Sequence, residues 1–111
     1  MTKHDLLTDA HNRALTYISE APKRRVFPAD RALDGLAAFD EHLPDAGTDA
    51  ADTLALLDKV GSPATVISNG PNYYGFVVGG TLPVAQAADW LASAWDQSAT
   101  VSLSGPAAHA I

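Results

Sequence analysis

The stretch TDAADTLALLDKVGSP, residues 48–63, carries the clearest fold signal in the chain. Its apolar residues recur at steps of three or four, which places them on one face of a helix: Ala50, Leu54, Leu57 and Val60. Thr48 is a favourable N-cap residue, and Gly61 followed by Pro63 is typical of a helix end. The sequence therefore predicts an amphipathic helix over residues 48–60.

Two further helices are predicted before this stretch. Residues 5–20 repeat apolar side chains at helical spacing, with Thr2 or Asp5 as the cap and Pro22 as the stop. A second pattern begins with Asp30 as its N-cap and ends at Pro44. Three consecutive helical patterns indicate that residues 1–60 form a helical part.

The period of the sequence changes after residue 63. Residues 64–68 and 73–78 are rich in β-branched or aromatic side chains, so the sequence predicts one or two short β segments there. A fourth helix is predicted from Thr81 and Pro83 to about Trp95, with apolar residues around most of its circumference. The predicted fold class is mainly α with one or two short β segments.

The overall composition limits the functions that this chain can have. Its 111 residues suffice for one domain at most, and 13 acidic against 7 basic residues give a net charge of −6. We expect no nucleic-acid partner, because phosphate polyanions require clustered Lys and Arg. We also expect no membrane partner, since no apolar run is long enough. With no cysteine and no apolar leader in the first residues, a cytoplasmic location is expected.

The charges are distributed very unevenly along the chain. Of the 20 charged side chains, only Asp89 and Asp96 lie in residues 61–111. Average usage would place roughly a dozen there, because a solvated surface normally carries many charges. We therefore expect residues 61–111 to be covered by other protein, either a partner or the remainder of a longer polypeptide.

No catalytic or metal-binding constellation stands out from the residues themselves. The four histidines are scattered in sequence without the spacing that places two on one metal ion: His4, His11, His42 and His109. The acidic pairs Asp40–Glu41 and Asp49–Asp52 lie among charged neighbours, which predicts a solvated face rather than acid catalysis. Gly79-Gly80-Thr81 before a helix resembles a phosphate-binding turn, but such a turn is more often plain backbone geometry.

Two stretches together carry a family resemblance. The first is GPNYYGFVVGG, residues 70–80, and the second is AADWLASAWDQ, residues 87–97, with Pro83 between them. The link RVFP, residues 25–28, which follows the first predicted helix, matches the same family. The chain resembles the N-terminal region of the pyridoxal 5′-phosphate (PLP)-dependent group II decarboxylases, the relatives of aromatic-L-amino-acid and glutamate decarboxylases, and in particular their bacterial branch.

The resemblance implies a helical appendage of a type I, aspartate aminotransferase-like fold rather than a complete domain. It divides the chain into a charged helical part, residues 1–60, and a part with an active-site loop and a dimer helix, residues 61–111. The large PLP domain is absent from residues 1–111. A loop of the family that lines the substrate side of the active site matches five residues: Phe76, Val77, Val78, Gly79 and Gly80.

The resemblance also implies a cofactor and partners. PLP serves the parent family, whose Schiff-base lysine lies in the large domain, and the three lysines of this chain match none of its motifs: Lys3, Lys23 and Lys59. We expect no catalytic residue here and no stable cofactor binding by this chain alone. The implied partners are the remainder of the decarboxylase, a second subunit of an intertwined homodimer, and an amino-acid substrate. Residues 98–101 match a region that reaches the neighbouring subunit's pocket.

Two functional hypotheses remain open at this point. In the first, the chain is the N-terminal part of a PLP-dependent amino-acid decarboxylase, which is a carboxy-lyase. This segment then supplies dimer contacts and part of the substrate-pocket wall, and it is inactive alone. In the second, it is a free-standing helical interaction or regulatory module that pairs with itself or with a full-length decarboxylase. A small-molecule binder that uses the Gly-Gly-Thr turn ranks behind both.

Overall fold

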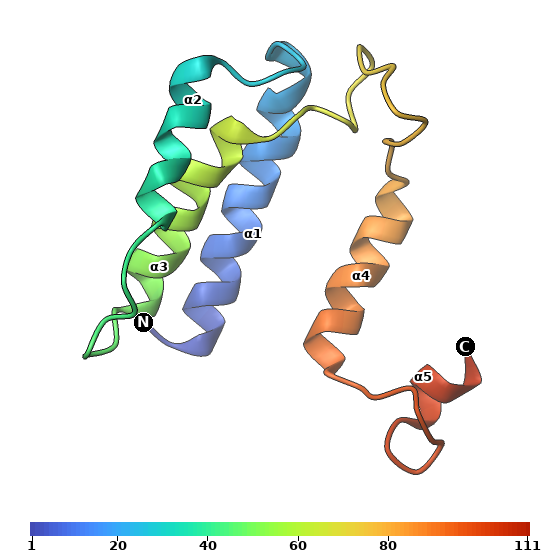
Figure 1. Ribbon diagram of the computed structural model, residues 1–111. Helices are drawn as coiled ribbons and strands as arrows, with labels where there is room; N and C mark the ends of the chain where they lie inside the picture. The colour runs from blue at the N-terminus through green and yellow to red at the C-terminus, as the bar shows by residue number, and fades with distance from the viewer. The chain divides into compact units, whose positions relative to one another are not determined.

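A computed structural model describes all residues, 1–111, and is mainly helical (Figure 1). The chain divides into two compact units, Met1–Gly79 and Gly80–Ile111. The first unit holds the helices α1, α2 and α3, and the second holds α4 and α5. No helix is both long and apolar enough to cross a lipid bilayer.

Helix α1 (Lys3–Glu20) begins with the cap that the sequence predicted. The Thr2 hydroxyl accepts a hydrogen bond from the Asp5 amide, and the Asp5 carboxylate accepts one from the Thr2 amide at 2.9 Å. This capping box satisfies two backbone donors that a helix start leaves without partners. A 3₁₀ turn (Ala21–Lys23) follows with Pro22 inside it, which confirms that the α-helix stops there.

Helix α2 (Asp30–Gly35) is shorter than predicted and starts one residue earlier, since Asp30 is its first residue rather than its cap. Ala29 is its N-cap and makes no capping hydrogen bond, so the prediction of Asp30 as the cap was wrong. The helix gives way to a 3₁₀ turn (Leu36–Phe39) directly after Gly35, and both end well before Pro44. Glycine weakens an α-helix because ordering its backbone costs more entropy, which accounts for the early end.

Helix α3 (Ala50–Leu56) continues as a π-helical turn (Leu57–Gly61) and a 3₁₀ turn (Ser62–Ala64). Its cap is Asp49 rather than Thr48, since the Asp49 carboxylate accepts a hydrogen bond from the Ala51 amide at 2.7 Å. The α-helix itself ends at Leu56, before the predicted end at residue 60, while the helical turns that follow it continue past Gly61 to Ala64.

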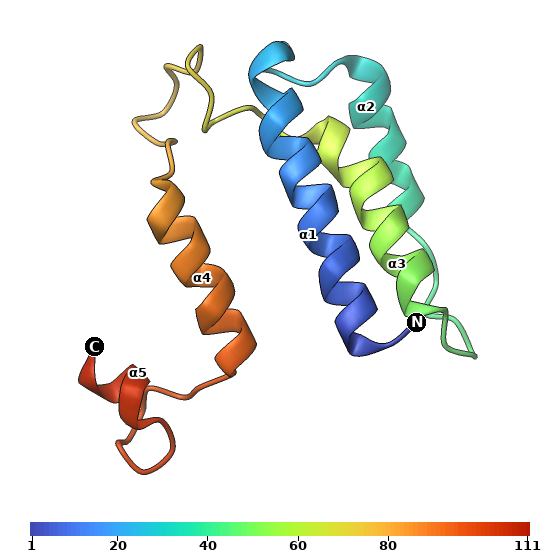
Figure 2. The ribbon, with the colours of Figure 1, turned by 180° about the vertical axis from the view of Figure 1, so that it is seen from behind.

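The helices of the first unit pack side by side around a small interior (Figures 1 and 2). Helix α3 contacts α1, and its π-helical continuation contacts the 3₁₀ turn that follows α2. The buried apolar residues of this unit are Ala21, Pro28 and Ile67. The Ile67 amide also donates a hydrogen bond to the Val26 carbonyl at 2.9 Å, which fixes the segment after α3 against the link between α1 and α2.

The prediction of one or two β segments was wrong, because the structure contains no strand. Residues 64–68 make a backbone hydrogen bond to Val26 but form no ladder, and residues 73–78 turn back on themselves. A strand needs a partner strand for its backbone groups, and these two segments do not pair. The lack of a partner strand therefore outweighs the β-propensity of residues 64–68 and 73–78.

In the second unit, α4 (Pro83–Trp95) begins with proline at its first position, after Leu82 as the N-cap. Asp96 ends the helix in the left-handed conformation, with φ of 49°. A short helix, α5 (Pro106–Ala110), follows a loop. No side chain of α4 is buried, so this helix has no core of its own to pack into.

Candidate functional site

The five residues matched to the substrate loop lie on one irregular turn. The Val78 amide approaches the Gly75 carbonyl at 3.4 Å, and the two residues between them, Phe76 and Val77, have φ of 58° and 55°. Gly79 and Gly80 also have positive φ, at 108° and 82°. Positive φ is ordinary for glycine but costs about 1–2 kcal/mol for residues with a Cβ, most of all β-branched valine.

The side chains of this turn point into solvent. Phe76 is 91% exposed and Val77 is 104% exposed, while Val78 is 63% exposed. Adjacent Tyr74 is 92% exposed. The turn therefore brings the predicted residues together, but the chain by itself forms no closed pocket around them.

Gly79 is the position on this turn where no side chain fits. A Cβ there would collide with the Ser68 carbonyl oxygen and would lie 3.0 Å from the Tyr73 ring. A Cβ on Gly80 would meet no atom within 4 Å. The two glycines therefore have different roles: Gly79 permits a close backbone approach, and Gly80 supplies only the unusual backbone angle.

Helix α4, which follows this turn in sequence, presents an uncovered apolar stripe. Val84, Leu91 and Trp95 are 75%, 54% and 52% exposed. Ala88, Leu91 and Trp95 follow Val84 by four, seven and eleven residues, so the four side chains share one face of the helix. These side chains form an exposed apolar stripe along α4.

A polar network ties α1 to the end of α3 in the first unit. The Arg13 guanidinium donates to Asp9 at 3.0 Å and to Asp58 at 2.9 Å, and the Ser62 hydroxyl donates to Asp58 at 2.6 Å. The sequence reasoning missed this network, although Asp9 and Arg13 stand at the i, i+4 spacing that predicts an ion pair on a helix.

The network shifts the pKa values of Asp58 and Arg13. The hydrogen bond from Ser62 lowers the pKa of Asp58 most, and the bond from Arg13 lowers it further, while burial opposes both. The Asp9 carboxylate and then the Asp58 carboxylate raise the pKa of Arg13. Each shift favours the charged form of the group, which is the pattern of a structural ion pair rather than of a proton-transfer site.

A second network centres on Arg24 in the link after α1. Its guanidinium donates to the Ser62 carbonyl at 2.8 Å and to the Thr65 carbonyl at 2.7 Å, and it lies 5.8 Å from the centre of the Tyr17 ring. The Tyr17 hydroxyl and the Thr65 hydroxyl are hydrogen-bonded at 2.8 Å. Arg24 therefore binds the carbonyls at the end of the α3 region, where a cation is favourable.

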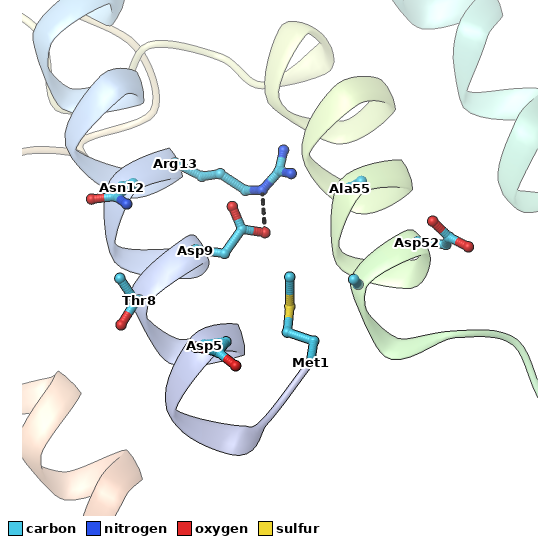
Figure 3. Close-up of a pocket in the computed structure, with 9 residues that line it drawn as sticks. Met1, Asp5, Thr8, Asp9, Asn12, Arg13, Asp52 and Ala55 are labelled. Carbon is cyan, nitrogen blue, oxygen red and sulfur yellow. Dashed lines mark hydrogen bonds and ion pairs between the residues drawn. The ribbon is translucent and has the colours of Figure 1, made fainter.

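The first unit also has an open depression of about 440 Å³ between α1 and α3 (Figure 3). Its lining is mixed and includes the Met1 side chain, the Asp9–Arg13 ion pair and Asp52. Asp52 and its predicted partner Asp49 are exposed, as are Asp40 and Glu41, which confirms the solvated face that the sequence predicted. This depression has the character of a surface groove rather than of a catalytic pocket.

The residues of this chain do not fit PLP. Lys3, Lys23 and Lys59 are exposed on the first unit, and Lys23 pairs with Glu20 at 3.2 Å. None of the three lysines lines the depression between α1 and α3. No group of three or more His, Cys, Asp or Glu side chains is placed to hold a metal ion.

Residues 98–101, which the resemblance assigns to a neighbouring pocket, form a local loop. The Ser98 and Thr100 hydroxyls are hydrogen-bonded at 2.9 Å, and both residues are exposed. Gly105 is buried here, and a Cβ on it would collide with the Ser98 carbonyl oxygen. Gly105 is thus a position in the second unit where the backbone comes too close to Ser98 for a side chain.

A scan against protein-family models and searches of curated proteins and solved structures found no match to this chain. The resemblance to the decarboxylases consequently depends on the residues quoted for it.

Proposed function

We propose that the chain is the N-terminal segment of a PLP-dependent amino-acid decarboxylase-like protein. In this role residues 61–111 supply dimer contacts and part of the substrate-pocket wall, and the chain alone carries no catalysis. The observation that carries the proposal is the turn at Phe76–Gly80. The side chains of Phe76 and Val77 are almost fully exposed on a strained backbone, which is an arrangement that a pocket wall in a larger protein can use.

The turn suits the wall of a pocket for chemical reasons. Apolar Phe76 and Val77 exclude water from a reacting centre, and Gly79 and Gly80 let the backbone approach a ligand closely. PLP, when bound in such an enzyme, stabilises the negative charge that develops as carbon dioxide leaves the substrate. This chain contributes the wall, and the lysine and the groups that hold PLP belong to the rest of the protein.

The reading frame downstream of Ile111 tests the proposal. We expect the DNA to continue, in frame or after a frameshift, into a large domain that carries the Schiff-base lysine motif. An unrelated downstream sequence contradicts the proposal. In the complete protein, Phe76→Ala is expected to lower kcat/KM for the amino acid by roughly ten-fold or more, because a wall of the pocket is lost. Leu43→Ala, at a 94% exposed loop position of the first unit, serves as the matched control and should leave kcat/KM unchanged.

The second candidate is a free-standing interaction module, and one observation favours it. The Arg13 and Arg24 networks give residues 1–79 long-range contacts of their own, so this unit does not need a large domain to hold its helices together. Such a module would pair with itself or with a full-length decarboxylase through the same exposed apolar surface.

A further inference from the structure

We infer that Arg24 is a positioning residue for the turn at Phe76–Gly80, which it holds in place through residues 62–68. The inference rests on the proposed function for the use of this turn, and it adds the group that sets the conformation of the turn. Residues 62–68 are called the platform below. Arg24 contacts the platform, and the platform contacts the turn.

The turn at Phe76–Gly80 needs contacts from outside itself to keep its shape. The hydrogen bond that closes it, from the Val78 amide to the Gly75 carbonyl, is long at 3.4 Å. Phe76 and Val77 have φ of 58° and 55°, which is costly for residues with a Cβ. A strained backbone of this kind persists only where the surrounding structure fixes it. The contacts that fix it must therefore lie elsewhere in the first unit.

Ser68 and Tyr73 supply these contacts. Gly79 lies so close to the Ser68 carbonyl oxygen that a Cβ on it would collide, and the same Cβ would lie 3.0 Å from the Tyr73 ring. A Cβ on Gly75 would lie 3.4 Å from the same ring. The backbone on both sides of Phe76 and Val77 thus lies against the half-buried Tyr73 ring, and its far end also lies against the platform.

Arg24 fixes the platform to the link between α1 and α2. Its guanidinium donates to the Ser62 carbonyl at 2.8 Å and to the Thr65 carbonyl at 2.7 Å. The amide of buried Ile67 donates to the Val26 carbonyl, two residues after Arg24. A planar guanidinium can hold two carbonyls in a fixed geometry, and a site is precise only when its supporting residues are held in this way. Loss of the guanidinium should therefore displace the platform and, with it, the turn.

NMR spectroscopy of the full chain tests the inference at Gly79. Glycine has a second α-proton where other residues have a Cβ, and on Gly79 this proton points at the Tyr73 ring. The ring current should therefore separate the resonances of the two α-protons. Arg24→Met should collapse this separation while the helices remain folded. The Ile67 amide should also exchange its hydrogen roughly ten-fold faster or more, because its bond to Val26 opens more often.

Two matched variants show whether the effect belongs to Arg24. Arg25→Met removes the neighbouring, exposed guanidinium and should leave the Gly79 resonances unchanged. Arg13→Met breaks the ion pair with Asp58 and so destabilises the same unit, but it keeps the Arg24 hydrogen bonds and should also leave these resonances unchanged. Collapse of the separation in Arg13→Met would mean that any loss of stability displaces the turn, and it would overturn the inference.

Arg24→Lys provides a milder variant if Arg24→Met fails to fold. The lysine ammonium keeps the charge but cannot hold two carbonyls in a fixed geometry, so the separation of the Gly79 α-protons should fall to an intermediate value. A separation as large as that of the unaltered chain, in either Arg24 variant, would overturn the inference. The reading frame after Ile111 does not enter these spectra, so the positioning role and the decarboxylase proposal can fail separately.

Discussion

In the first unit, Met1–Gly79, hydrogen bonds join residues that are far apart in sequence, from Arg13 to Asp58 and from Arg24 to Ser62 and Thr65. In the second unit, Gly80–Ile111, the side chains of Gln97, Ser98 and Ser104 bond only two or three residues away. The first unit also holds the buried side chain of Ile67, whereas α4 buries none. This difference teaches that polar contacts between distant residues order the first unit, whereas α4 keeps its apolar side chains exposed.

Loss of the buried side chain in the first unit should have the largest effect on stability. Ile67 is 2% exposed, so Ile67→Ala is expected to lower the free energy of unfolding by about 2–5 kcal/mol. The measurement is urea unfolding followed by far-UV circular dichroism. Leu43→Ala, at a 94% exposed position, should change it by less than about 0.5 kcal/mol. Equal effects of the two variants would show that Ile67 is no core residue.

The two glycines of the turn should differ from each other. Gly79→Ala is expected to cost about 1–3 kcal/mol, because the new Cβ collides with the Ser68 carbonyl and φ is positive. Gly80→Ala should cost about 1 kcal/mol, since only the backbone angle opposes it. Urea midpoints of both variants measure the difference. A Gly80→Ala cost equal to that of Gly79→Ala would contradict the close approach to Ser68.

Neighbouring arginines offer a matched test of the Arg24 network. Arg24→Met keeps much of the apolar stem but removes the donors to the Ser62 and Thr65 carbonyls, which should cost about 1–2 kcal/mol. Arg25 is exposed, and Arg25→Met should be nearly neutral. Thermal unfolding followed by circular dichroism compares the stability of the two variants. If Arg25→Met proves as costly, the network does not hold the first unit together.

The smallest expected effect is the dependence of stability on acid. Because the pKa of Asp58 is lowered in the folded state, its contribution is present above the ordinary value of 3.8 and is lost as the pH falls below it. Asp58→Asn should cost about 0.5–1 kcal/mol at pH 7 and should flatten the loss of stability below pH 4. Urea unfolding at several pH values measures both. Asp45→Asn, in an exposed turn, should leave the slope of the unfolding free energy against pH unchanged. The same unchanged slope in Asp58→Asn would contradict the account.

The sequence was most informative where signals are local. The cap of α1 is Thr2, one of the two residues predicted for it, and the helix stops at Pro22 as predicted; both signals depend on residues within a few positions. The caps of α2 and α3 were each misplaced by one residue, because Ala29 and Asp49 occupy the extended backbone position just before each helix.

Features that depend on residues far apart in the chain could not be predicted from the sequence. The strands predicted at 64–68 and 73–78 fail because each lacks a strand to pair with, which no local propensity reveals. The Arg24 network joins residues about 40 positions apart, and only folding brings them together. Of the candidate site, the resemblance named Phe76–Gly80 as a loop, whereas the residue pattern predicted a strand through residue 78; the positive φ values and the close approach of Gly79 to Ser68 required the structure.

The central claim is that the second unit is covered by another protein chain. Sedimentation equilibrium of the intact chain over a range from low micromolar to millimolar concentration tests it most directly. The account predicts a mass that rises with concentration from 11.6 kDa toward twice that value, with Leu91→Asp remaining near the lower mass. A constant mass of 11.6 kDa for the unaltered chain across the whole range would contradict the account.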